Sequence, residues 1–190
     1  MGASLVTAPT VEPVTLAMAK AHLRIDSADL DANLATEIIA AREYVEGQTR
    51  RILAPATWDF TFADLCSEIV FPVTPVISVT SVSYVDTNGA TQTLASNQYQ
   101  TVGLGDDSLP RIVPAYDVEW PSVRDQPEAV TVRARCGYEY GSPAVISIPQ
   151  ALRYAILLQV ELLHDRDVQA KSALEDARDS LMSPYRVIRL

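Results

Sequence analysis

The residues that could perform chemistry are few, and they are widely spaced along the chain. His22 and His164 are the only two histidines, and they fall in separate predicted helices. Neither has a Cys, Asp or His at the spacing of a metal site. The run from His164 to Asp167 is polar, and we interpret it as the solvated end of a helix.

Two acidic pairs are the next candidates. Asp29 and Asp31 lie two residues apart at a predicted helix start, so their side chains diverge and suit the positive end of the helix dipole. Asp106 and Asp107 follow two loop glycines in the manner of an oxygen-rich cation site. No further ligand stands at regular spacing from them, so a calcium site is disfavoured.

Motifs for nucleophiles and phosphates are absent. The sequence has no Gly-x-Ser-x-Gly, no Walker loop and no dinucleotide fingerprint, and no serine has a local base. Cys66 and Cys136 are too few for a disulfide framework, and we expect each to be a small buried hydrophobe. The sequence therefore predicts no enzyme, no metal and no cofactor.

Two helical regions, residues 14–54 and 148–183, would have to position any site. Thr15 is expected to cap a short helix, and Asp26 or Ser27 to cap the next one. That second helix has one apolar stripe with helical spacing, formed by Leu30, Leu34, Ile38, Ala41 and Val45.

The C-terminal helical region begins with Pro149 as the first helical residue. Its helix is apolar nearly all round, which predicts burial in a bundle centre or in a subunit interface. The interface candidates on it are Tyr154, Leu157, Leu158 and Leu162. A last helix should turn Leu174, Ala177 and Leu181 inward and end at Pro184. The tail after it is apolar and cationic, and consists of Tyr185, Arg186, Val187, Ile188, Arg189 and Leu190.

The middle of the chain has the period of two that is typical of strands. Residues 56–62 and 130–136 alternate cleanly, while residues 76–86 change phase and predict a bulge near Thr80 and Ser81. Asn88-Gly89 predicts a hairpin with a strand returning to Leu94. We expect residues 1–13 to form an extended arm, and residues 103–127 a long loop with one short strand at 111–113.

These patterns predict an α+β fold: a helical bundle of about four helices, two N-terminal and two C-terminal, interrupted by an antiparallel β-rich insertion. The expected domains are a helical core of residues 1–55 and 145–190 and an inserted subdomain of residues 56–144. The chain has 190 residues, a net charge of −9 and no basic run, which disfavours sequence-driven binding to nucleic acid or to an anionic membrane. No apolar run approaches the length of a membrane span, and the first residues do not predict a signal peptide.

Several short motifs, taken in order, resemble the head–tail connector (neck adaptor, head completion) proteins of long-tailed phages and prophages. In the N-terminal helical region they are Leu5–Pro9, Glu12–Leu16, Ala19–Arg24 with Asp26, Ile39–Glu46 and Thr49–Arg51. In the rest of the chain they are Val79–Val82, Asn88-Gly89, Trp120-Pro121 with Arg124, Ala129–Arg133, Gly137-Tyr138, Ile148–Ala151 and Pro184–Arg186.

The resemblance implies a structural protein of the virion neck, made in the host cytoplasm, that forms a ring of about twelve subunits. Its implied partners are the portal protein above and a neck, stopper or tail protein below. Genomic DNA would pass through the ring without sequence-specific binding, and an acidic channel would suit that passage. The resemblance also implies that the C-terminal segment, Tyr185 to Leu190, grips the portal.

Two other functions remain open. A ligand- or glycan-binding β-module is suggested by the aromatic residues of the insert, which are Trp58, Tyr84, Tyr99, Tyr116 and Trp120. A hydrolase using scattered carboxylates is the third hypothesis.

Overall fold

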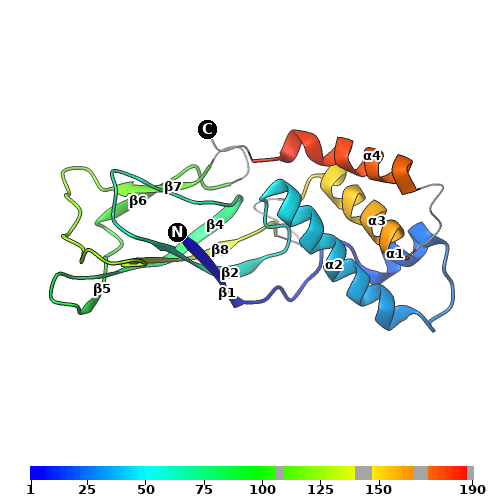
Figure 1. Cartoon of the computed structure of the whole chain (residues 1–190), viewed down its shortest axis with the longest axis horizontal. Helices are drawn as coiled ribbons and strands as arrows, with labels where there is room; N and C mark the ends of the chain where they lie inside the picture. The colour runs from blue at the N-terminus through cyan, green and yellow to red at the C-terminus, as the bar shows by residue number, and fades with distance from the viewer. Residues whose placement is uncertain (106–108, 140–146, 165–170, 188–190) are drawn as a thin grey trace. The chain divides into compact units, whose positions relative to one another are not determined.

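The computed structural model describes residues 1–105, 109–139, 147–164 and 171–187. The chain forms two compact units, each built from segments that are far apart in sequence. The β unit comprises Met1–Pro9 and Pro55–Tyr138, and the helical unit comprises Thr10–Ala54 and Glu139–Leu190 (Figure 1). Four helices and antiparallel sheets confirm the predicted α+β fold class.

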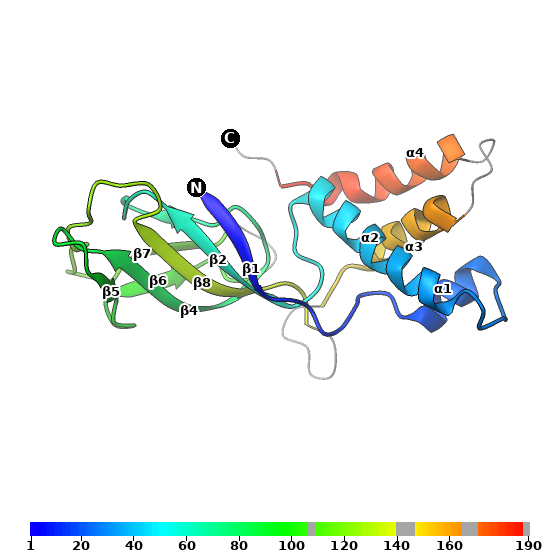
Figure 2. The ribbon, with the colours of Figure 1, turned by 60° about the horizontal axis from the view of Figure 1, so that its bottom comes forward.

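The β unit is built around a five-stranded antiparallel sheet of order β1-β2-β8-β4-β5 (Figure 2). Its strands are β1 (Gly2–Thr7), β2 (Ala56–Phe62), β4 (Val76–Val85), β5 (Thr91–Thr93) and β8 (Val130–Cys136). A second sheet of order β3-β7-β6 consists of β3 (Ile69–Val70), β6 (Tyr99–Val102) and β7 (Arg111–Pro114).

Alternation along the strands separates a buried face of the large sheet from an exposed one. Phe60, Val82 and Val132 are cross-strand neighbours and are fully buried. The rings of Phe60 and Phe71 pack edge-on, with their centroids 5.4 Å apart, and Phe71 directly follows β3. The core of the β unit therefore joins both sheets.

The predicted bulge and hairpin are confirmed. The pairing of β4 with β8 shifts between Val79 and Ser81, at the place where the sequence changes phase. Gly89 has φ 88°, a conformation that favours glycine, and its N–H donates to the carbonyl of Asp86 at 2.9 Å. The Asp86 carboxylate accepts the N–H groups of Asn88 and Ala90, each at 2.9 Å, and so fixes the turn.

The helical unit contains α1 (Leu16–Leu23), α2 (Asp31–Thr49), α3 (Gln150–His164), α4 (Lys171–Met182) and a 3₁₀ turn η1 (Ser183–Tyr185). Thr15 caps α1 as predicted, and its hydroxyl accepts the N–H of Met18 at 3.3 Å. The apolar stripe of α2 is buried at Leu34, Ile38 and Val45, and α2 packs against α3.

Three details of the helical prediction are wrong. The N-cap of α2 is Leu30, because Ser27 bonds instead to Asp29 in the preceding turn. The carbonyl of Pro149 accepts N–H groups of α3, which starts one residue later at Gln150. On α4, Ala177 is exposed and the buried position is taken by Arg178.

The β unit also differs from the prediction in three places. The expected arm contains the strand β1, which pairs with β2; its exposed side chains leave no hydrophobic alternation to detect. β6 was not predicted, because Tyr99–Val102 alternates only weakly in polarity. Cys66 is exposed, whereas Cys136 is buried as expected.

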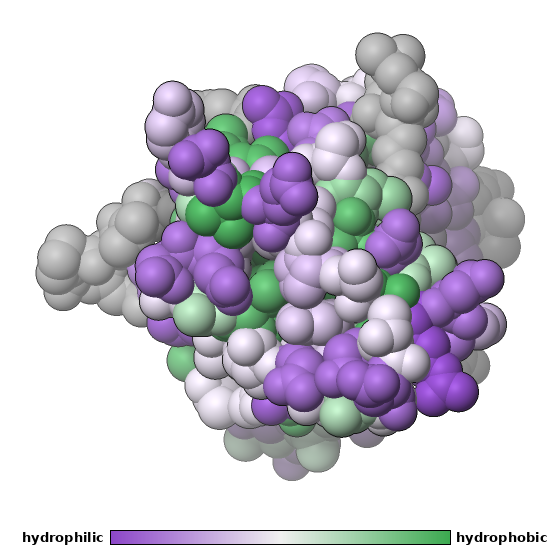
Figure 3. Space-filling model, turned by 90° about the vertical axis from the view of Figure 1, so that its left-hand side faces the viewer, coloured by the Kyte–Doolittle hydropathy of each residue, from purple (hydrophilic) through white to green (hydrophobic). Residues whose placement is uncertain are grey.

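The exposed face of the large sheet carries a charged pair on two neighbouring inner strands, β2 and β8. Arg133 on β8 donates from Nε and Nη2 to the two carboxylate oxygens of Asp59 on β2, both at 2.8 Å. These bonds hold the pKa of Asp59 below its ordinary value, and the attraction of the guanidinium adds to their effect. Figure 3 views the end of the β unit where β5 lies, and hydrophobic residues surface there in small groups between hydrophilic ones.

We expect Asp59→Asn to lower stability near neutral pH, because it removes the ion pair with Arg133. The loss should be only roughly 0.3–1 kcal/mol, since Arg133 is about half exposed. A depressed pKa stabilises the fold above the unfolded value, about 3.9, and this contribution disappears as the pH falls through the folded pKa. The difference between wild type and variant should therefore shrink below about pH 4. Denaturant unfolding at a series of pH values measures it, and a constant difference would contradict the assignment.

Candidate functional site

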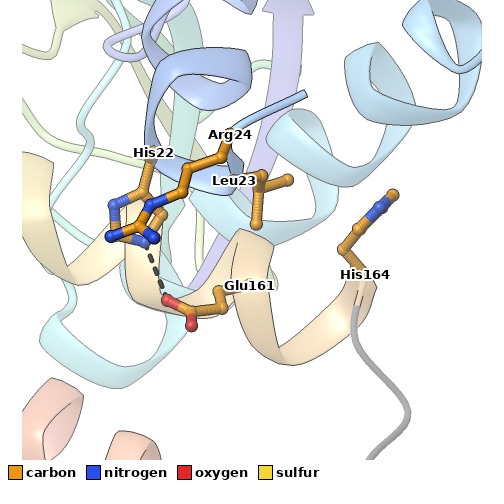
Figure 4. A pocket seen from close by; sticks show the side chains of 5 residues that line it. All are labelled: His22, Leu23, Arg24, Glu161 and His164. Atoms are coloured by element: carbon orange, nitrogen blue, oxygen red, sulfur yellow. Dashed lines mark hydrogen bonds and ion pairs between the residues drawn. The ribbon is translucent and has the colours of Figure 1, made fainter. Parts of the chain in front are cut away.

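An open pocket in the helical unit is lined by both histidines. His22, Leu23 and Arg24 line it from the end of α1, and Glu161 and His164 line it from α3 (Figure 4). The sequence contains no signal for this shared pocket, because the two histidines are far apart along the chain. Such a pair is found only when the packing of α1 on α3 is known.

Each histidine in the pocket is paired with a glutamate on another helix. His22 Nε2 lies 2.8 Å from Glu161 Oε2, and His164 Nδ1 lies 3.1 Å from Glu37 Oε2 on α2. The His22 ring also meets Tyr154 edge-on at 5.9 Å. The two pairs therefore tie α1 and α2 to α3, which is a structural role.

The pocket shows no arrangement for metal binding or nucleophilic catalysis. Within residues 1–105, 109–139, 147–164 and 171–187, no three His, Cys, Asp or Glu side chains lie where they could hold a metal ion together. Burial raises the pKa of the Cys136 thiol to about 12, so it stays protonated and unreactive at neutral pH. Asp106, Asp107 and the residues 165–167 lie outside the described residues.

Buried arginines form the polar centres of the helical unit. Arg178 on α4 is 6% exposed, lies 4.5 Å above the ring of Tyr44 and donates to the amide oxygen of Gln159. The spacing of Leu174, Arg178 and Met182 at steps of four would have revealed this position. It was missed because only apolar residues were counted as buried.

A second buried arginine fixes the start of the helical unit to α2. Arg42 donates from Nε to Glu12 at 2.8 Å and from Nη1 to Glu46 at 2.7 Å. Burial lowers the pKa of Arg42, but the two carboxylates outweigh it, so its pKa is raised overall. Glu46 also accepts the N–H of Leu53 at 2.7 Å, which holds the chain after α2.

The four interface candidates on α3 divide into two groups. Leu158 and Leu162 are 4% and 7% exposed and belong to the core of the helical unit. Tyr154 is 49% exposed and Leu157 is partly exposed, so these two present the outer side of α3. Leu158 and Leu162 therefore fit burial in the bundle centre, whereas Tyr154 and Leu157 stay candidates for a subunit interface.

The beginning of the C-terminal tail lies against the end of α2. The Tyr185 carbonyl accepts Arg51 Nε at 2.8 Å, and the Arg51 guanidinium lies 5.8 Å from the Tyr185 ring. The N–H of Val187 donates to the carbonyl of Thr49 at 3.0 Å, while Arg186 is exposed. Ile188, Arg189 and Leu190 lie outside the described residues.

No helix among the described residues is long and apolar enough to cross a membrane. No family model matches the sequence, and no curated protein matches it either. Solved structures do match, and they match over the whole chain.

Three of the matching structures come from gene transfer agent (GTA) particles. One is a chain in the neck of an empty GTA particle with C6 symmetry, with a TM-score of 0.80 and 24% identity. Another belongs to the virion of a native GTA particle, with a TM-score of 0.78 and 23% identity. A third belongs to the neck of a native GTA particle with C12 symmetry, with a TM-score of 0.77 and 23% identity.

Each alignment covers 100% of this chain and 97% of the other. At this level of identity the likeness establishes the fold. This chain therefore has the fold of a chain found in GTA particles, and the shared fold includes both the β unit and the helical unit.

The difference in burial along α3 predicts a large loss of stability for one substitution and a small loss for another. Leu158→Ala removes packed methyl groups from the core and should cost about 2–5 kcal/mol. Tyr154→Ala removes a half-exposed ring and should cost less than about 1 kcal/mol. Denaturant unfolding followed by helical circular dichroism compares them, and equal losses would show that the Tyr154 side is also core.

Proposed function

We propose that this chain is a structural protein of the neck of a phage-like virion, a head–tail connector that forms a ring beneath the portal. The observation that carries the proposal is the full-length likeness to chains of GTA particles, two of them described in the neck. The order of sequence motifs supports the same conclusion independently of the fold. The ring would join the DNA-filled head to the next neck or tail protein.

The symmetry of the related particles supports a ring. The neck structures are described with C12 and C6 symmetry. A ring of about twelve identical subunits needs two different complementary surfaces on every copy. The outer side of α3, with Tyr154 and Leu157, is one candidate surface in the helical unit.

The chemistry of the described residues is consistent with a structural role. Each pocket histidine is paired with a glutamate, and Arg42 and Arg178 are buried within the helical unit. The net charge of −9 would repel DNA phosphates, which suits a collar that DNA slides through. These features fit a protein that works by binding other proteins of the virion.

The alternative of a glycan-binding β-module gains little support from the β unit. Of the five aromatic residues that suggested it, only Tyr116 is exposed, at 93%. The other four are partly covered, and a sugar platform needs exposed, neighbouring rings.

Purified virions of the source phage or prophage should contain this chain at the head–tail joint. Cryo-EM of those particles should show about twelve copies in a ring under the portal, as the C12 relative suggests. Absence of the chain from purified particles would overturn the proposal. A monomer in solution would not, because a ring can depend on the portal as its template.

The tail gives a sharper test of portal docking. Deleting 185–190 would also remove the contacts of Tyr185 to Arg51 and of Val187 to Thr49, so the better truncation ends after Val187. We expect this variant, lacking Ile188, Arg189 and Leu190, to keep the wild-type melting temperature but to lose binding to portal-bearing heads. Arg186→Ala is the matched control, because it removes an exposed positive charge of the tail without shortening the chain. Wild-type docking by the truncated chain would show that the tail does not grip the portal.

A further inference from the structure

The outer edge of β1 is unprotected. β1 is the first strand of the five-stranded sheet and, among the described residues, pairs only with β2. Residues 1–8 contain no charged side chain and no proline. Leu5 and Val6 are 48% and 44% exposed. Soluble proteins normally blunt such an edge with charge, proline or a covering segment, so an open one indicates a docking strand.

The opposite edge of the same sheet is also uncharged. It is formed by β5, whose three residues are all exposed. The whole stretch from Thr87 to Gly105, which includes β5 and β6, has no charged residue, although 21% of the chain is charged. Interface cores are depleted of charge, and an uncharged edge avoids the repulsion between copies of an acidic chain. These two edges are therefore places where copies can approach closely.

We infer that β1 of one copy pairs with β5 of the next copy, so that the large sheet continues from subunit to subunit. The occupant of each edge is a second copy, because this chain itself carries an uncharged, exposed strand at both edges of the sheet. The contact is head-to-tail, the type that closes into a ring. The inference rests on the proposed function for the ring, and it names the surfaces that hold the ring together.

Strand directions fix the geometry of this contact. The pairs β1–β2, β2–β8, β8–β4 and β4–β5 are all antiparallel, so β1 and β5 run in the same direction. Neighbours in a twelve-fold ring are related by a rotation of only about 30°. β5 of one copy would therefore meet β1 of the next in a parallel pair. A two-fold dimer would instead pair β1 with β1 in antiparallel fashion.

The register within the sheet identifies residues for cross-linking. Ser4 lies opposite Asp59, and Thr93 opposite Ser83, and all four are on the face that carries Arg133. Ser4 and Thr93 are both exposed, so substitutions there should not disturb the core. Cys66 is exposed and must be changed to Ser in every variant, whereas the buried Cys136 can remain.

The decisive experiment is disulfide trapping in assembled particles. Ser4→Cys with Thr93→Cys should give a ladder of cross-linked oligomers under oxidising conditions, because strand spacing places the two sulfurs within bonding range. A second variant combines Ser4→Cys with Thr91→Cys. It tests the alternative register, because Thr91 and Thr93 lie on the same face of β5. Ser4→Cys with Gln92→Cys is the matched control, because adjacent residues point to opposite faces. Ser4→Cys alone reports a two-fold dimer.

A charge pair tests the contact without cysteines. Ser4→Glu with Thr93→Glu should reduce incorporation into particles by roughly tenfold or more, since like charges would face each other across the edge. Ser4→Lys with Thr93→Glu should restore incorporation. Unchanged incorporation of the double glutamate variant would overturn the inference, as would loss without rescue.

The outcomes separate this inference from the proposed function. If particles contain the Cys66→Ser parent but neither cysteine pair gives a ladder, the edge contact is wrong and the neck function stands. A dimer from Ser4→Cys alone, without a ladder, overturns the head-to-tail contact as well. If particles lack the parent, the neck function is wrong, and the purified double-cysteine chain then decides on edge pairing by the presence or absence of cross-linked oligomers.

Discussion

The fold depends on one pairing, that of Ala56 with Cys136. These residues are the first of β2 and the last of β8, and they lie opposite each other in adjacent strands. An insertion of more than eighty residues can interrupt a helical bundle only if it returns the chain to the place where it left. The antiparallel pairing of its first and last long strands does this, because the two connections at the ends of the insertion then start from neighbouring strands. The inner residues of β8, fully buried at Val130, Val132 and Ala134, hold that pairing in place.

The sequence predicted the elements whose pattern is strong and local. The alternation of β2 and β8, the phase change at Thr80 and Ser81 and the Asn88-Gly89 turn each depend on neighbouring residues, and all are present. β1 and β6 were missed because an edge strand in solvent has little polarity contrast. The partner of β1 also lies far along the chain, and a single sequence does not show such a partner.

The candidate site was less predictable than the fold. The pairing of His22 with Glu161 joins residues 139 positions apart, so no spacing rule could find it. Arg178 was missed for a different reason: a cation can occupy a core position when it stacks on a ring such as Tyr44 and donates to a buried amide. The apolar character of α3 was read correctly, but only the packing shows that Leu158 is core and Tyr154 is not.

The position of β1 has a consequence for how the protein is made. Gly2 pairs with Thr61, so β1 must wait for β2 to be synthesised, and β2 must wait for β8. The helical unit likewise needs α3, which is synthesised after the whole insertion. Neither unit can be completed from a contiguous piece of chain, and most contacts that close each one are long-range. The large sheet, and with it the paired form of the β1 edge, can therefore be complete only after β8 has been synthesised.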